Sequence, residues 1–71
     1  MEKKVDMVKA GKKLRELRGV RTRSGVSRQT GIPYSTLQAY ENGEREPSGT
    51  NKEKLSSYYD TTVASIFYTE E

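Results

Sequence analysis

The sequence predicts a small all-α domain, and three features support that fold class. Apolar residues recur at helical steps of three and four, and no segment alternates apolar and polar residues as a half-buried strand would. Glycine and proline residues divide the chain into short stretches that each fit a few turns of helix. At 71 residues, the chain has room for one domain with a modest core.

The first expected helix covers about residues 7–18. Four apolar residues recur at steps of three, four and three, and so share one stripe of the helix: Met7, Ala10, Leu14 and Leu17. Asp6 can cap the start of this helix, and Gly19 ends it. The basic residues Arg15 and Arg18 suit the negative end of the helix dipole.

Two shorter helices are expected next. The second begins after Thr22 as N-cap, runs for about two turns and stops at Gly31. Gly25 lies inside it and lowers its stability by up to about 1 kcal/mol relative to alanine. The third covers about 33–41, with Pro33 at or near the first helical position, where its missing N–H costs nothing.

Two further helices complete the prediction, over about 50–59 and 62–67. Leu55 pairs with Tyr58 and Tyr59 at helical spacing in the fourth helix. The fifth begins at Thr61 or Thr62, and its apolar residues are Val63, Ile66 and Phe67. We expect one domain over residues 1–71 with an ordered core of about 6–68, because chain ends generally fray.

The composition excludes several classes of function. The chain has no Cys and no His, which argues against disulfides, Cys/His zinc sites and thiol or imidazole catalysis. We therefore expect no metal, no cofactor and no enzymatic activity. The sequence also lacks an apolar run long enough to span a bilayer and a secretory leader, so we expect a cytoplasmic protein with no membrane partner.

The charge is distributed unevenly along the chain. Residues 1–28 hold ten Lys/Arg and three Asp/Glu, a net charge of +7, whereas residues 29–71 hold three and seven, a net charge of −4. A basic half suits a polyanionic partner such as DNA, since neutralising phosphates releases counterions. Solvated helix faces are the alternative explanation for the basic residues.

Residues 22–43 have the pattern of a helix-turn-helix, in which the second helix enters the major groove of DNA. Ser27 supplies the small residue needed where two such helices touch, and Gly31 supplies a turn residue that tolerates positive φ. Leu37 and Tyr40 share one face of the second helix and can anchor it to the domain.

The segments "LRELRG", "TRSGVSRQTGIPYSTLQAYENGEREPS" and "KLSSYYDTTVASIF" resemble, in order and spacing, the Cro/cI-type or XRE family of helix-turn-helix transcriptional regulators. The resemblance covers about residues 10–68. It implies a compact five-helix, lambda-repressor-like domain that binds operator DNA, usually as a homodimer on a palindromic site. It further implies a repressor or Cro-like switch protein whose recognition helix lies at about 33–41.

Helical geometry, at about 100° per residue, predicts which residues of that helix face away from Leu37. The outward face comprises Ser35, Thr36, Gln38 and Ala39. Gln38 is the best candidate for direct base readout, because its amide can pair bidentately with adenine. Tyr34 lies near the edge of the core, so packing and a base contact at the tip of the recognition helix remain equal alternatives.

The resemblance also implies phosphate contacts at the rim of this surface. Arg23 occupies the family position at the start of the second helix that lies against a phosphate, supported by Arg21 and Thr22. Asn42 and Arg45, in the loop after the recognition helix, match positions that hold the opposite strand. Such contacts position a protein on DNA without reading its sequence.

Glu41 points back toward the domain, within about 40° of Leu37 by helical geometry. In the family this glutamate pairs with an arginine of the first helix, and the matching residue here is Arg18. We therefore expect a structural ion pair, not a catalytic carboxylate.

Glu44 and Glu46 flank Arg45 and could repel phosphate, which motivates a second hypothesis. The same domain could be a protein-interaction module, such as an antitoxin or an antirepressor that binds another regulatory protein. Leu55, Val63, Ile66 and Phe67 are assigned mainly to the core. A dimer or partner contact would be marked by any of the following that prove exposed: Tyr58, Tyr59, Ile66, Phe67 and Tyr68.

Overall fold

The computed structural model describes residues 6–68, which form five α-helices and contain no strand. The helices are α1 (Met7–Arg18), α2 (Arg23–Thr30), α3 (Tyr34–Glu41), α4 (Gly49–Tyr58) and α5 (Val63–Phe67). The prediction of a five-helix all-α fold is confirmed. The prediction that the chain ends fray concerns residues 1–5 and 69–71, which lie outside the described residues.

Local side-chain caps explain most of the helix boundaries. The Asp6 carboxylate accepts the amide hydrogens of Val8 and Lys9, each at 3.1 Å, at the start of α1. The Ser48 hydroxyl accepts from the amide of Asn51 and starts α4 at Gly49, one residue earlier than expected. These boundaries follow from hydrogen bonds that local sequence can supply.

The first residue of α3 also differs by one from the prediction. Pro33 precedes the helix as its N-cap residue, with an extended backbone of φ −56° and ψ 146°, and α3 begins at Tyr34. No side chain caps this helix end. Pro33 has no N–H group, so the start of α3 has one unsatisfied hydrogen-bond donor fewer than it would have with another residue there.

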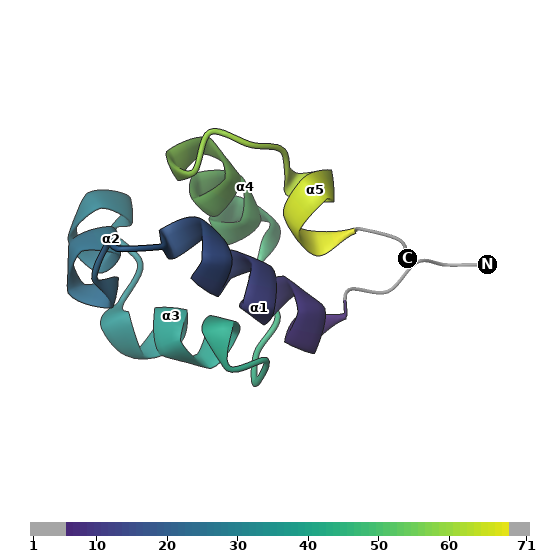
Figure 1. Cartoon of the computed structure of the whole chain (residues 1–71), viewed down its shortest axis with the longest axis horizontal. Coiled ribbons are helices and arrows are strands. Elements are labelled where there is room, and N and C mark those ends of the chain that lie inside the picture. The colour runs from purple at the N-terminus through teal and green to yellow at the C-terminus, as the bar shows by residue number, and fades with distance from the viewer. Residues whose placement is uncertain (1–5, 69–71) are drawn as a thin grey trace.

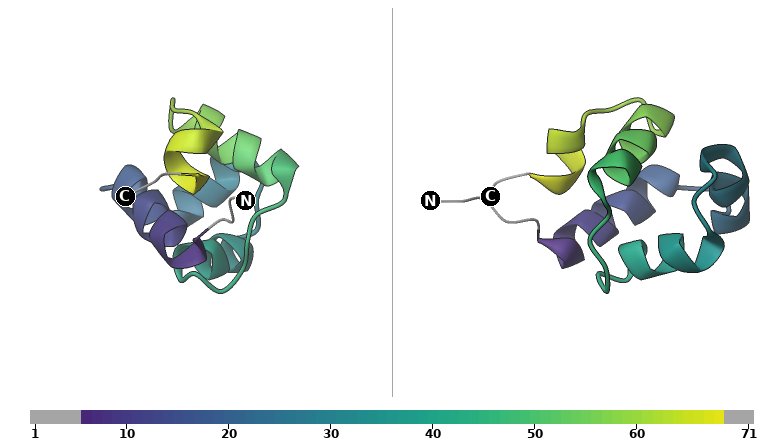
Figure 2. Two further views of the ribbon diagram at one scale, coloured as in Figure 1. Left: turned by 90° about the vertical axis from the view of Figure 1, so that its right-hand side faces the viewer. Right: turned by 180° about the vertical axis from the view of Figure 1, so that it is seen from behind.

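The first helix runs through the middle of the domain (Figure 1). It packs against α3 on one side and α5 on the other, while α2 packs against α3 and α4. Figure 2 shows the same order from two further sides, with α3 and α4 on opposite sides of the molecule. This arrangement leaves one long side of α3 without a neighbouring helix.

All five helices contribute to the core. Its buried apolar residues are Ala10, Leu14, Val26, Ile32, Leu37, Tyr40, Leu55, Ile66 and Phe67. Val63, assigned to the core from sequence, is only partly buried against this cluster. Met7 is 37% exposed although it shares the apolar stripe of α1, because it lies at the open end of that helix.

A close backbone contact between α1 and α3 depends on Gly11. A Cβ atom added at Gly11 would lie 2.5 Å from the carbonyl oxygen of Glu41 and 2.6 Å from that of Tyr40. Any larger residue would therefore push the C-terminal end of α3 away from α1. Sequence reasoning missed this role, since Gly11 lies inside a helical pattern without a turn signal.

Candidate nucleic-acid interface

The turn between α2 and α3 is held by short-range hydrogen bonds. Gly31 has φ 78°, the left-handed conformation expected of it, and ends α2. The Ser27 hydroxyl donates to the carbonyl oxygen of Ile32 at 2.6 Å. The Thr30 hydroxyl donates to the carbonyl oxygen of Val26 at 2.7 Å and accepts the amide hydrogen of Ile32 at 3.2 Å. These contacts fix the angle at which α3 leaves the turn.

The two faces of α3 differ sharply in burial. Leu37, Tyr40 and Glu41 are buried, and the Tyr40 hydroxyl accepts a hydrogen bond from the Asn51 side chain at 2.9 Å. Among the residues predicted to face outward, Ser35 and Gln38 are exposed, and Thr36 and Ala39 are half-buried. Tyr34 is 46% exposed, so its ring also lies at the surface.

The buried carboxylate of Glu41 binds two arginines. Arg18 donates from Nε to Glu41 Oε2 at 2.8 Å and from Nη2 to Oε1 at 3.0 Å. Arg23 donates from its Nε to Glu41 Oε1 at 2.9 Å. The Glu41 side chain is 3% exposed, so a single buried carboxylate joins α1, the start of α2 and the end of α3.

These contacts decide the charge state of Glu41. Burial alone raises the pKa of a carboxyl group, but the hydrogen bonds from Arg18 and Arg23 outweigh burial and hold the pKa of Glu41 below its usual value. The same bond to Glu41, with a smaller contribution from Tyr34, raises the pKa of Arg23. Glu41 and Arg23 are therefore both charged at neutral pH.

The other residues predicted at the start of α2 lie in different surroundings. The Thr22 hydroxyl accepts the amide hydrogen of Gly25 at 3.0 Å and caps α2. Arg21 donates to the Leu17 carbonyl, and its guanidinium carbon lies 5.6 Å from the ring centroid of Tyr58. The guanidinium of Arg21 thus contacts the aromatic end of α4. That Arg21 contacts a DNA phosphate stays a prediction.

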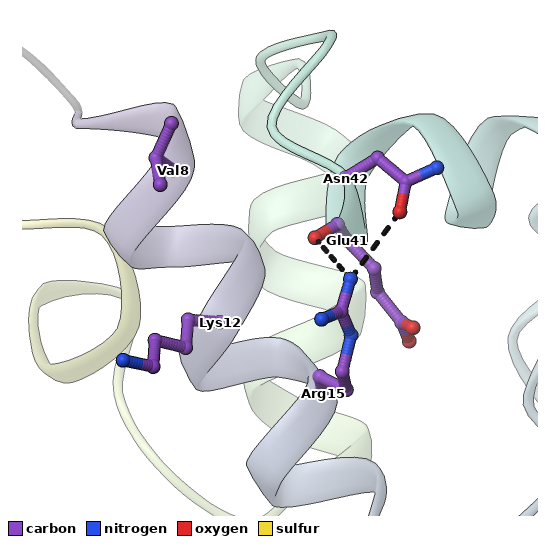
Figure 3. Close-up of a pocket in the computed structure, with 5 residues that line it drawn as sticks. All are labelled: Val8, Lys12, Arg15, Glu41 and Asn42. Carbon is purple, nitrogen blue, oxygen red and sulfur yellow. Dashed lines mark hydrogen bonds between the residues drawn. The ribbon is translucent and has the colours of Figure 1, made fainter.

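Beyond the C-terminal end of α3, Asn42 contacts a residue that sequence reasoning did not assign to the site. Arg15 donates from Nη2 to the carbonyl oxygen of Glu41 and to the side-chain oxygen of Asn42, both at 3.2 Å (Figure 3). These residues line an open cavity of about 390 Å³ together with Val8 and Lys12. Arg15 was expected only to favour the dipole of its own helix, because a contact 26 residues distant has no local signal.

The loop after α3 brings its two glutamates into different environments. The Glu46 carboxylate accepts from the ammonium of Lys52 at 2.9 Å. The Lys52 side chain is largely buried, and its ammonium also donates to the Tyr68 hydroxyl at 2.8 Å; the two bonds raise the pKa of Lys52. Glu44 and Arg45 are both exposed. The negative charge of Glu46 is therefore compensated within the domain.

Within residues 6–68, no helix is both long enough and apolar enough to cross a bilayer. The same part of the chain contains no group of three or more His, Cys, Asp or Glu side chains that could hold a metal ion.

Comparisons with known proteins agree with this geometry. A helix-turn-helix family model matches residues 12–66. The chain is also similar to the crystal structure of the restriction-modification controller protein C.AhdI from Aeromonas hydrophila, with 31% sequence identity and a TM-score of 0.79. That similarity covers 87% of this chain and 97% of the controller protein. A search of curated protein sequences gave no match.

The family match spans α2 and α3, which carry the turn and the exposed helix face, and continues to Ile66 in α5. The resemblance stated from the sequence is confirmed by this match and by the likeness to a controller protein. The chain belongs to the XRE family of helix-turn-helix transcriptional regulators, which are DNA-binding proteins.

Proposed function

We propose that this domain is a sequence-specific regulator, a repressor or Cro-like switch protein, that places α3 in the major groove of an operator. The observation that carries the proposal is the division of α3 into two faces. Leu37, Tyr40 and Glu41 fasten one face to the domain, and the opposite face offers short polar side chains without a covering helix. A helix presented in this way suits base readout.

Each exposed side chain of α3 has a role that its chemistry allows. Gln38 can donate and accept at once, as bidentate pairing with adenine requires. Ser35 and Thr36 can bind bases or phosphates, and Ala39 can contact a thymine methyl group. The exposed hydroxyphenyl ring of Tyr34 extends this surface at the first turn of α3.

Phosphate contacts would lie on both sides of α3. Thr22 and Arg23 lie at the start of α2, whose first turn adds the positive end of a helix dipole. Arg23 uses its Nε on Glu41, and the Nη groups of an arginine carry four further N–H donors. Asn42 and Arg45 follow the C-terminal end of α3, so phosphate donors come from two separate segments, which we propose hold opposite strands.

We further propose that the domain acts as a homodimer on a palindromic operator. The similarity to a restriction-modification controller protein supports a regulatory role. A two-fold symmetric dimer predicts two half-sites whose centres are about 34 Å apart, or one turn of B-DNA. The partly exposed Tyr68, next to the last helix, is available for contact with a second copy.

Selection of binding sites from random DNA tests the proposal, followed by affinity measurements on the selected site. We expect Gln38→Ala to weaken binding by about 1–3 kcal/mol and to relax selection at one base position of each half-site. Arg45→Ala should weaken binding to all sequences alike and lower the slope of log K against log salt by about one per contact.

Lys54→Ala is the matched control for the charge change, because Lys54 is exposed on α4 and lines a hollow with Gln29 and Thr30 of α2 that contains no residue of α3. It should leave both the selected sequence and the salt slope nearly unchanged. A failure to enrich any sequence, with all three variants alike, would contradict sequence-specific binding through α3.

The protein-interaction module loses one of its supports. Its case from sequence rested on Glu44, on Glu46 and on the net negative charge of residues 29–71, and the charge of Glu46 is compensated by Lys52. Glu44 is exposed, so it still supports the interaction module. If no DNA is bound at low salt while a regulatory protein co-purifies, the interaction module is the better assignment.

A further inference from the structure

The C-terminal end of α3 lacks a basic residue of its own to bind the last carbonyl groups of the helix. Arg15, one turn before the end of α1, supplies that positive charge from a neighbouring helix. Its Nη2 group lies 3.2 Å from the Glu41 carbonyl oxygen, where the dipole of α3 is negative. The guanidinium is thus held at the point where the chain leaves α3.

The same Nη2 group lies 3.2 Å from the Asn42 side-chain oxygen. An arginine can only donate hydrogen bonds, so the atom of the Asn42 amide that faces it must be the oxygen. The amide nitrogen then lies on the side of the amide that is farther from Arg15 (Figure 3). Two N–H donors of Asn42 are presented outward.

This orientation is the one that a phosphate group needs, because phosphate oxygens accept hydrogen bonds and do not donate them. Without Arg15, the exposed amide of Asn42 can rotate and turn its oxygen toward the phosphate, which is repulsive. We infer that Arg15 is a positioning residue that holds the amide nitrogen of Asn42 toward a backbone phosphate of bound DNA. This inference rests on the proposed function and on the phosphate contact of Asn42.

The backbone around the pair is well fixed. The amide of Asn42 donates to the carbonyl oxygen of Gln38 at 2.9 Å, which holds its main chain against the last turn of α3. Gly11 precedes Arg15 by four residues, so both lie on the face of α1 that touches α3. The close approach at Gly11 brings Arg15 within reach of Glu41 and Asn42.

Lys12 provides a control within the same cavity. It lines the cavity with Arg15 and carries the same charge, but its side chain points away from Arg15 and Asn42 (Figure 3). Replacing Lys12 by glutamine therefore removes one positive charge from this region and leaves the Asn42 contact intact. The difference between Arg15→Gln and Lys12→Gln isolates the effect of positioning from the general effect of charge.

The test is a double-mutant cycle on the selected operator, with every variant first shown to be folded by circular dichroism. Asn42→Ala should weaken binding about tenfold, the effect of losing one hydrogen bond to a charged group. Arg15→Gln should weaken binding about fivefold more than Lys12→Gln does, a smaller effect because the amide can still sample the productive orientation. In the Asn42→Ala background, Arg15→Gln should cost no more than Lys12→Gln.

A second readout does not depend on DNA. In the free wild-type protein, NMR relaxation of side-chain amides should show Asn42 ordered to about the degree of Asn51, whose amide donates to Tyr40. The exposed amide of Gln38 provides the mobile reference. This measurement remains available if Arg15→Gln fails to fold.

The outcomes separate the inference from the proposed function. Equal effects of Arg15→Gln in both backgrounds, equal effects of Arg15→Gln and Lys12→Gln, or an Asn42 amide as mobile as that of Gln38 would each overturn the positioning role. An Asn42→Ala variant with unchanged affinity would overturn it too, because the assumed phosphate contact would be absent. In all of these cases the wild-type protein still binds its operator, whereas loss of the proposed function would appear as no binding at all.

Discussion

Replacing Gly11 by alanine should destabilise the domain, although alanine is the better helix former. In a helix interior the substitution by itself contributes about 1 kcal/mol of stability. The added Cβ, however, would lie 2.5 Å and 2.6 Å from two carbonyl oxygens of α3, well inside the 3.4 Å at which ordinary contact begins. Backbone atoms cannot rotate out of the way, so α1 and α3 must separate by several tenths of an ångström.

Overpacking of this kind costs about 1–3 kcal/mol, and contact with rigid backbone favours the upper part of that range. After the helix-propensity gain, we expect a net loss of about 1–2 kcal/mol. For a domain of this size, that loss corresponds to a decrease in Tm of about 5–15 °C. The displaced end of α3 carries Asn42, so operator affinity should fall as well.

Thermal and urea denaturation followed by circular dichroism measure the effect. Gly49→Ala is the matched control, since a Cβ at Gly49 in the first turn of α4 would have no neighbour within 4 Å. That variant should equal or exceed the wild type in stability, by up to about 1 kcal/mol. If Gly11→Ala is as stable as Gly49→Ala, the close approach of α1 and α3 does not limit packing and our reasoning is refuted.

Three further predictions concern ionisable groups. The pKa of Glu41 is lowered in the folded state, so its contribution to stability is present above the unfolded value of 4.5 and is lost as the pH falls through the folded value. The Arg18→Met variant loses two hydrogen bonds to Glu41, so its acid denaturation should begin at a higher pH than that of the wild type. Coincident denaturation curves would exclude the ion pair as the cause. Burial raises the pKa of Tyr59 to about 12, so the folded state retains a proton that the unfolded chain releases near pH 10, and stability should fall between these values. Ultraviolet titration of the phenolate should show one transition fewer near pH 12 in Tyr59→Phe, and an unchanged titration would contradict this environment. Lys52→Met should leave the carboxylate of Glu46 without its ion pair and weaken operator binding, most strongly at low salt. Adding Glu46→Gln to this variant should restore the affinity. No recovery in the double variant would mean that Glu46 does not repel DNA.

Much of the fold was accessible from sequence, because local interactions set it. The caps at Asp6 and Thr22 and the turn at Gly31 act over two to four residues, and all three are predicted from sequence. For the fifth helix the sequence leaves Thr61 and Thr62 as alternatives, and Thr62 is the cap. The one-residue shift at α4 has the same local origin, since Ser48 was not recognised as its cap. Short-range hydrogen bonds are encoded in adjacent residues, so the sequence exposes them directly.

The site was predicted unevenly for a related reason. The outward face of α3 follows from the rotation of about 100° per residue that every α-helix shares. Ser35 and Gln38 are indeed exposed. The partners of long charged side chains did not follow. Arg23 shares Glu41 with Arg18, and Arg21 lies against tyrosine rings, although both were expected only to face phosphate.

The sequence by itself predicted the five helices, the caps at Asp6 and Thr22, the turn at Gly31 and the outward face of α3. Only the tertiary structure decided that Arg15 holds Asn42, that Lys52 compensates Glu46 and that Gly11 must be a glycine. Each of these contacts joins segments that meet only when the helices pack. A flexible charged side chain can reach several partners, so the relative placement of the helices determines which one it binds.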